Sequence, residues 1–258
     1  MSRIEEFTLD ISPLSQNPRK IWVYLPESYD HTKKKYDVLY MFDGHNLFDD
    51  QVATYGKSWG FKEYLDEKKL DLVVIGQDCN HTGSKRMDEY CPFTAERLWG
   101  DDAIYACGDV TGDWFVNRLK PECEKRYRIY KTKKHVGIGG SSMGGLMAEY
   151  MIAKYSDVYS KAACISPAHY YCWNSLNRLM KESEQSGSRI FLSYGENEIK
   201  GDDGRAFIMT SSLLDISHTF ESRGASTYPY LQKDGNHSEA SWEQLIPIFL
   251  EWMYPDLY

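Results

Sequence analysis

The stretch HVGIGGSSMGGLMAEYM at residues 135–151 decides the fold class. It begins as a short apolar strand and ends with apolar side chains spaced three and four residues apart, as in a buried helix. Between them lies Gly140-Ser141-Ser142-Met143-Gly144, which has the pattern G-x-S-x-G. A strand, a sharp turn and a helix in this order form the context in which that pattern presents a reactive serine above a sheet.

Ser142 is therefore the candidate nucleophile. A serine in such a turn has a strained backbone, and side chains two residues before and after it would collide, which explains the glycines at 140 and 144. Ser141 lacks this symmetry, because Gly139 lies two residues before it but Met143 lies two residues after it. The alternative interpretation of this segment is a glycine-rich turn that only joins a strand to a helix and has no catalytic role. A phosphate-binding loop is excluded because no Lys-Ser/Thr follows and the G-x-G-x-x-G spacing is absent.

Strand and helix patterns alternate along the rest of the chain. Residues 7–11 and 21–25 alternate apolar and polar side chains around a turn, which predicts an antiparallel hairpin. Continuous apolar runs suited to strands buried on both faces follow at 38–42, 72–75, 136–138, 162–165, 190–192 and 228–231. Helical patterns lie near 59–67, 103–125, 142–155, 173–185, 205–222 and 239–253. We expect one domain over residues 1–258, a three-layer α/β sandwich whose mostly parallel sheet has an antiparallel N-terminal edge.

Composition narrows the function classes. The chain of 258 residues has 30 Lys+Arg and 38 Asp+Glu, a net charge of −8, which argues against a nucleic-acid partner. No apolar run approaches the ~18 residues of a membrane span, and the first residues contain no secretory signal, so we expect a cytoplasmic protein. The six cysteines are scattered without C-x-x-C, which predicts free thiols, no metal site and no cofactor.

A catalytic serine needs a base, and three histidines follow it in the chain. His218 lies in a helical pattern where a solvent-facing position is expected. His169 comes soon after the nucleophile and leaves little chain for an acid before it. His237 lies in a loop after the last strand, at the sheet edge where α/β proteins present ligands, and is the preferred base.

The acid and the oxyanion hole are expected on two other loops. Glu198 and Glu196 both follow the strand at 190–194, and we prefer Glu198 as the group that orients the base. The backbone amides of Met143 and His45 are the expected oxyanion-hole donors, with Gly44 allowing the chain to turn inward before His45. An ordinary turn is the alternative for this Asp-Gly sequence.

Four segments in this order resemble the putative-esterase family of α/β hydrolases, which includes esterase D and the enterochelin and feruloyl esterases. The segments are DGHNLFD at 43–49, GSSMGG at 140–145, Gly195-x-x-Glu198 and GNHSE-x-x-W at 235–242. The resemblance runs from about residue 19 to the C-terminus. It implies an α/β-hydrolase fold, a Ser142–Glu198–His237 triad and an oxyanion hole of the His45 and Met143 amides. Members of the family commonly have Gln where this chain has His45. Their ester substrates differ widely in the acyl and alcohol groups, so membership does not fix the substrate.

Substrate features are less specific. Aromatic side chains suited to sugar or phenolic rings gather on the expected site side, although aromatics make up 14% of the chain and several must fall in loops anyway. These candidate substrate-binding residues are Trp59, Trp99, Tyr170, Tyr171 and Trp173. The polar and aromatic segment 80–109 is long for a loop and is a candidate lid or pocket wall.

The sequence thus predicts a serine esterase that acts on a small ester or on a sugar or phenolic ester through an acyl-enzyme. Two alternatives stay open: an acyltransferase that passes the acyl group to a sugar or alcohol, and a catalytically silent binding module on the same fold. The expected partner is a small-molecule ester, with no nucleic acid and no membrane. The sequence is compatible with a homo-oligomer.

Overall fold

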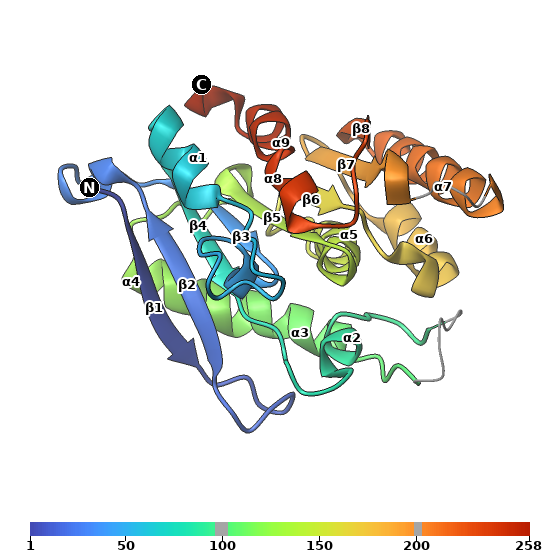
Figure 1. Cartoon of the computed structure of the whole chain (residues 1–258), viewed down its shortest axis with the longest axis horizontal. Coiled ribbons are helices and arrows are strands. Elements are labelled where there is room, and N and C mark those ends of the chain that lie inside the picture. Colours follow the sequence, from blue (N-terminus) through green and yellow to red (C-terminus); the bar gives the residue numbers. More distant parts are fainter. Residues whose placement is uncertain (96–102, 199–202) are drawn as a thin grey trace.

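The apolar runs of the chain form one mixed sheet (Figure 1). A computed structural model describes residues 1–95, 103–198 and 203–258, and within them eight strands lie in the order β1-β2-β4-β3-β5-β6-β7-β8. The pairs β1–β2 and β2–β4 are antiparallel, and all later neighbours are parallel, which confirms the predicted sheet. The strands are β1 (Arg3–Leu9), β2 (Arg19–Leu25), β3 (Asp37–Met41), β4 (Leu72–Gln77), β5 (Val136–Ser141), β6 (Lys161–Ile165), β7 (Arg189–Gly195) and β8 (Ser226–Gln232).

Helices follow the strands at the predicted places, with three differences, the first of which is a short helix at Lys85–Glu89 that no pattern predicted. The helices are α1 (Phe61–Lys68), α2 (Lys85–Glu89), α3 (Gly108–Trp114), α4 (Lys120–Arg126), α5 (Met143–Lys154), α6 (Trp173–Glu182), α7 (Asp203–Ser222), α8 (Glu239–Glu243) and α9 (Ile246–Met253). The helix expected over 239–253 is divided into α8 and α9, because Pro247 suits the first turn of a helix and not its interior. The helix expected over 103–125 is interrupted by a π-helical turn at Phe115–Leu119.

The two faces of the sheet pack into two separate cores. Along β3, Val38 and Tyr40 pack into a core with α3 to α7, whereas Leu39 and Met41 pack into a second core with α1 and α9. This alternation follows from the two-residue period of a strand. All four side chains are fully buried, as expected for a strand covered on both faces (Figure 1).

The sheet order brings the loops of the candidate site together. β3 and β5 are neighbours, and the chain continues from β3 to β4 on one side but from β5 to β6 on the other side. Such a switch point between two parallel strands is where α/β sheets bind ligands. Met41 pairs with Gly139, which places the loop after β3 beside the turn at Ser142. Gly195 pairs with Gln232, which places the loops that carry Glu198 and His237 side by side.

The remaining sequence expectations concern thiols and membranes. None of the six cysteines, all of which lie in the described ranges, forms a disulfide, and five of them are buried. Within the described ranges, no helix combines the length and the apolar character that crossing a membrane requires.

Candidate active site

Ser142 lies at the sharp turn between β5 and α5. Its backbone has φ 58° and ψ −121°, a conformation that L-residues rarely adopt. A Cβ at Gly140 would lie 2.7 Å from the backbone of Gly144, and a Cβ at Gly144 would lie 3.0 Å from the Cβ of Phe42. The two glycines are therefore required by close packing around a strained serine, which is the steric reason expected from the sequence.

His237 and Glu198 form a hydrogen-bonded pair. Nδ1 of His237 lies 2.7 Å from Oε2 of Glu198. The other oxygen, Oε1, accepts hydrogen bonds from the Ser166 hydroxyl at 2.7 Å and from the Gly195 backbone N–H at 2.8 Å. The Glu198 side chain is 3% exposed, whereas that of His237 is 47% exposed and its ring packs edge-on against Trp242. A fixed carboxylate thus orients an accessible imidazole.

The rival side chains have other partners. Oε2 of Glu196 accepts a hydrogen bond from the backbone N–H of Asp234 at 3.0 Å, so this carboxylate ties the two loops together. His169 is buried and its Nδ1 lies 3.3 Å from Oε1 of Glu149 in the core. His218 is exposed on α7, as expected. Among the three histidines after Ser142, His237 is the one that lines a cavity with the serine.

The loop after β3 is held close to the sheet. Asp43, not Gly44, takes the left-handed conformation, with φ 57°. Gly44 is needed for a different reason: a Cβ there would lie 2.5 Å from the backbone of Gly76 in β4. His45 follows in a 3-10 turn (η2, Gly44–Asn46), and Met143 is the first residue of α5, where a backbone N–H has no intrahelical acceptor.

Charged side chains fix the walls of the site. Arg86 donates from Nε and Nη2 to the two carboxylate oxygens of Asp43 at 2.8 and 2.7 Å. Burial works against its charge, but the facing Asp43 carboxylate raises the pKa of Arg86. The Asn46 amide, in the same loop as Asp43, donates to Oε1 of Glu239 at 3.2 Å, and burial raises the pKa of Glu239.

These segments enclose a cavity of about 370 Å³ at the carboxyl edge of the sheet. It is lined mainly by polar side chains, and the segment after residue 80 supplies one of its walls. The lining residues are Asp43, His45, Asn46, Thr54, Tyr55, Cys79, Asn80, His81, Gly83, Arg86, Ser141, Ser142, His237, Glu239 and Trp242.

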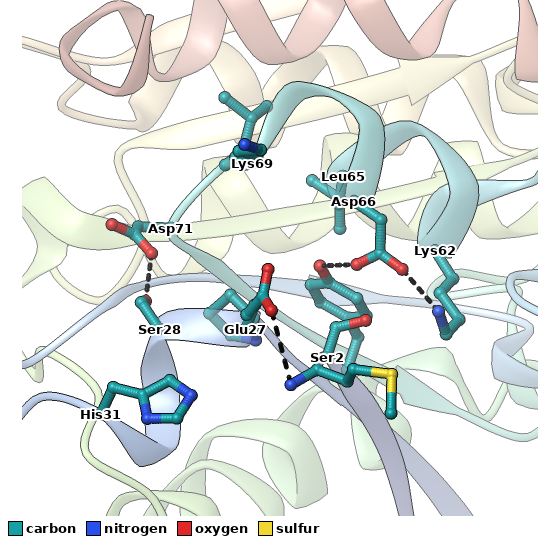
Figure 2. Close-up of a pocket in the computed structure, with 13 residues that line it drawn as sticks. Ser2, Glu27, Ser28, His31, Lys62, Leu65, Asp66, Lys69 and Asp71 are labelled. Carbon is teal, nitrogen blue, oxygen red and sulfur yellow. Dashed lines mark hydrogen bonds and ion pairs between the residues drawn. The ribbon is translucent and has the colours of Figure 1, made fainter.

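A larger cavity, of about 570 Å³, lies elsewhere in the molecule (Figure 2). Asp71, which lines it, directly precedes β4, so the cavity opens at the amino edge of the parallel strands. Two of its charged side chains, Lys62 and Asp66, form an ion pair at 2.5 Å. This cavity contains none of the candidate catalytic residues.

Four of the expected substrate-binding residues do not line the Ser142 cavity: Trp59, Tyr170, Tyr171 and Trp173. The interpretation of Trp59 is wrong in this respect: the side chain is 2% exposed and packs in the core between α1 and α9. Tyr170 and Trp173 line a neighbouring pocket with His169 and α7. Trp99 is outside the described residues. Tyr171 is buried.

Sequence reasoning missed several residues that shape the site. Tyr55 lines the cavity and is 81% exposed, and Ser166 supports Glu198 from the end of β6. Asp78, Cys79 and His81 directly follow β4 and gather beside His45, although the scattered cysteines predicted no metal-type cluster. A strand followed by a polar Asp-Cys-x-His sequence was the available signal, because loops at carboxyl ends of strands face the site.

The sequence and the fold both match known proteins. A model of the family described as Putative esterase matches residues 12–252. An uncharacterized protein, YbbA of Bacillus subtilis (strain 168), is 24% identical over 246 residues, 92% of each chain.

Two solved structures share the fold. An IroE-like serine hydrolase from Shewanella oneidensis superposes with a TM-score of 0.76 at 16% identity, covering 95% of this chain and 78% of that one. An S-formylglutathione hydrolase from Agrobacterium tumefaciens gives a TM-score of 0.69 at 13% identity, covering 100% and 96%. The fold is thus that of the α/β serine hydrolases. The chain belongs to the Putative esterase family, and it is an esterase.

Proposed function

We propose that the protein hydrolyses carboxylic esters through an acyl-enzyme formed on Ser142, with His237 as base and Glu198 as acid. The observation that carries this proposal is the meeting of three separate loops. A strained serine lies at one cavity wall, and an accessible histidine at the same cavity is fixed by a buried carboxylate at 2.7 Å. This arrangement serves nucleophilic catalysis by a hydroxyl group.

The proposed reaction has two steps. In the first, the Ser142 oxygen attacks the ester carbonyl while Nε2 of His237 accepts its proton, and the alcohol leaves with that proton. In the second, water gives a proton to His237 and attacks the acyl-enzyme, which releases the acid and restores the serine. Glu198 stabilises the imidazolium that forms in both steps, since its Oε2 faces Nδ1.

The amides of Met143 and His45 are the proposed oxyanion donors. Met143 opens α5, where the amide direction and the helix dipole both favour negative charge. His45 lies on the loop that the Gly44–Gly76 approach fixes against β4. Because the backbone fixes both donors before substrate binds, they need little reorganisation as charge develops on the carbonyl oxygen.

Replacement of Ser142 tests the reaction. In the Ser142→Ala variant we expect p-nitrophenyl acetate hydrolysis to fall to the background rate, and stoichiometric labelling by a fluorophosphonate probe to disappear. The wild-type protein should be labelled once, at Ser142. Unchanged turnover in the variant, or labelling at another residue, would refute the proposal.

The proposed substrate class is a small ester or an ester with a sugar or phenolic ring. The cavity of about 370 Å³ is near the small end of ligand pockets, and its walls are polar. Tyr55, which is 81% exposed at this cavity, provides an aromatic face on which a ring can stack.

The Tyr55→Ala variant tests the substrate class. We expect KM to rise about 3- to 10-fold for feruloyl and acetylated-sugar esters, because a ring stacking contact contributes ~0.5–1.5 kcal/mol. KM for p-nitrophenyl acetate in the same variant measures any general damage to the site. An equal rise for every ester, or no change for any, would refute the stacking role. Added alcohols and sugars in the same assays separate hydrolysis from acyl transfer, since a transferase would yield a new ester.

A further inference from the structure

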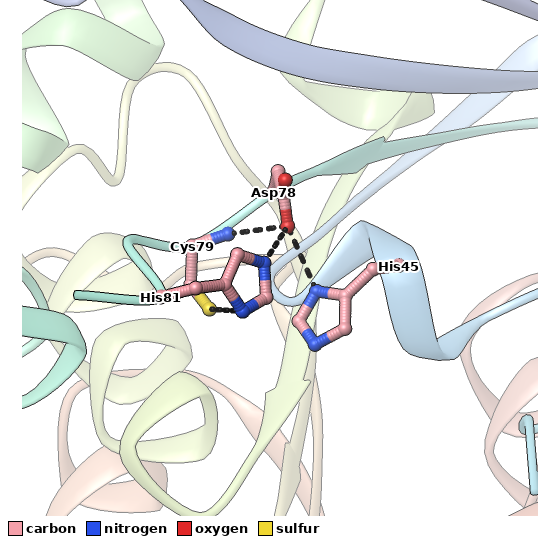
Figure 3. Close-up of side chains that lie close together, drawn as sticks. All are labelled: His45, Asp78, Cys79 and His81. Carbon is pink, nitrogen blue, oxygen red and sulfur yellow. Dashed lines mark hydrogen bonds and ion pairs between the residues drawn. The ribbon is translucent and has the colours of Figure 1, made fainter. Parts of the chain in front are cut away.

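Four side chains with metal-binding atoms meet at one wall of the cavity (Figure 3). They are His45 from the loop after β3, and Asp78, Cys79 and His81 from the loop after β4. One ligand atom from each lies within 4.8 Å of the others. Figure 3 shows the Asp78 carboxylate between the two imidazole rings, with the Cys79 sulfur directed toward His81.

The separations are close to those of a tetrahedral metal centre. Oδ1 of Asp78 lies 2.9 Å from Nδ1 of His45 and 2.9 Å from Nε2 of His81, and Sγ of Cys79 lies 3.9 Å from Nδ1 of His81. Around a zinc ion with bonds of about 2.0–2.3 Å, neighbouring ligand atoms lie roughly 3.3–3.7 Å apart. His81 can give only one of its two ring nitrogens to an ion. One ligand atom from each residue can nevertheless be chosen so that all four lie within 4.8 Å of one another, a spacing that side-chain rotations can reduce to that of a coordination shell.

The buried nitrogen of His45 is the second observation that indicates a ligand. The side chain is 6% exposed. Although Nδ1 is 2.9 Å from the Asp78 carboxylate, its geometry is not that of a hydrogen bond, and it has no other partner among the described residues. Nε2 lies 2.9 Å from the Thr54 hydroxyl. When Nε2–H donates to Thr54, the Nδ1 lone pair faces the cluster, as in metal-binding histidines supported by an outer hydrogen bond.

We propose that His45, Asp78, Cys79 and His81 bind one divalent metal ion of borderline softness, such as Zn²⁺. The donor set supports this class, since imidazole and thiolate favour Zn²⁺ over Mg²⁺ or Ca²⁺, which prefer oxygen ligands. One carboxylate and one thiolate neutralise the two charges of the ion in a partly buried site. The Cys79 thiol gives its proton to water as the metal–sulfur bond forms.

The position of this ion connects it to the candidate catalytic apparatus. The His45 imidazole would hold the metal, while the backbone amide of the same residue is the proposed oxyanion donor. Coordination of the side chain constrains the backbone of the same residue. We therefore expect metal occupancy to change the rate of ester hydrolysis. Binding itself does not depend on the proposed function, because none of the four ligands takes part in the proton transfers of Ser142.

Calorimetric titration of the purified, metal-free protein with Zn²⁺ tests the site. We expect one ion per chain, and a loss of affinity of roughly 100-fold or more in Cys79→Ser and in His81→Ala, since even outer partners of a metal change its affinity 10- to 100-fold. Matched controls are Cys107→Ser and His31→Ala, which remove a thiol and an imidazole outside the cluster and should bind as the wild type does. Circular dichroism confirms that each variant is folded.

Two further readouts make the result specific. Titration with Co²⁺ should give a thiolate-to-cobalt charge-transfer absorption in the wild type and none in Cys79→Ser. Ser142→Ala should bind Zn²⁺ as the wild type does, even though it has lost esterase activity, so failure of the metal site and failure of the proposed reaction are distinguishable. Equal Zn²⁺ affinity in the wild type, Cys79→Ser and His81→Ala, or equal losses in the controls, would overturn the proposal.

Discussion

Replacement of Glu198 by Gln is the sharpest test of the proposed acid, because the hydrogen bonds dictate how the amide must lie. Oε1 of Glu198 accepts from the backbone N–H of Gly195, and a backbone N–H cannot become an acceptor. In the Gln variant the carbonyl oxygen must keep this position. The NH₂ group is then forced to the position of Oε2, where it faces Nδ1 of His237 at the present 2.7 Å.

This orientation selects the wrong histidine tautomer. Nδ1 of His237 must accept a hydrogen bond from the amide, so the ring proton moves to Nε2, and Nε2 can no longer accept the proton of Ser142. The variant also lacks the negative charge that stabilises the imidazolium. The corresponding change in a serine protease triad lowers kcat about 10⁴-fold. We expect a loss of roughly 10³- to 10⁴-fold here, which corresponds to about 4–5.5 kcal/mol in the activation free energy.

The assay is p-nitrophenyl acetate hydrolysis, with kcat and KM measured separately. KM should change little, since Glu198 lies behind His237 and does not line the cavity. Glu196→Gln is the matched control: its carboxylate accepts one hydrogen bond from a backbone N–H, which the amide oxygen can also accept, so its kcat should stay within about threefold. Full activity in Glu198→Gln, or an equal loss in Glu196→Gln, would refute the reasoning.

Two further predictions concern the backbone beside the site and a buried acid in the core. A Cβ in Gly44→Ala would lie 2.5 Å from backbone atoms of Gly76. We therefore expect the free energy of unfolding, measured with denaturant, to fall by about 1–3 kcal/mol, and kcat to fall because the His45 amide is displaced. A wild-type kcat in this variant would contradict the reasoning. Burial raises the pKa of Glu149, although the neighbouring His169 opposes the shift. The contribution of this group to the free energy of unfolding is therefore fully present below pH 4.5 and is lost as the pH rises through the raised pKa. Glu149→Gln should therefore flatten the fall of unfolding free energy between pH 4.5 and the raised pKa, by at most about 1.4 kcal/mol per pH unit, and unchanged slopes in this interval would refute the assignment.

The fold was predictable because its determinants are local. The continuous apolar runs at β3 to β7 are buried on both faces, as their pattern predicts, and the hairpin of β1 and β2 shows its alternation directly in the sequence. The run at 228–231 is the exception, because β8 lies at the edge of the sheet and most of its residues are exposed or half-buried. The helix divisions needed more than periodicity. Pro247 leaves the apolar pattern of the last helical segment intact and changes its hydrogen bonding. The pattern thus predicted the face of the segment and missed its interruption.

The candidate site was predictable only where a backbone constraint has a sequence signature. Ser142 is marked by its flanking glycines, and His237 and Glu198 by their positions after strands. Trp59 was misplaced because composition cannot distinguish an aromatic residue in the core from one at a cavity. Tyr55 contributes to the cavity through the path of a long loop, which no local pattern encodes.

His45 shows why one position can carry two roles that a sequence motif does not separate. Its backbone amide belongs to the loop that the Gly44–Gly76 approach fixes, and any residue type could supply that amide. Its side chain is a different matter, because a glutamine there would present an amide to Asp78 and Cys79, whereas an imidazole presents a basic nitrogen. The departure from the common glutamine therefore leaves the proposed oxyanion donor intact and changes what the cavity wall can bind. The proposed oxyanion donation and the proposed metal binding therefore use different atoms of one residue.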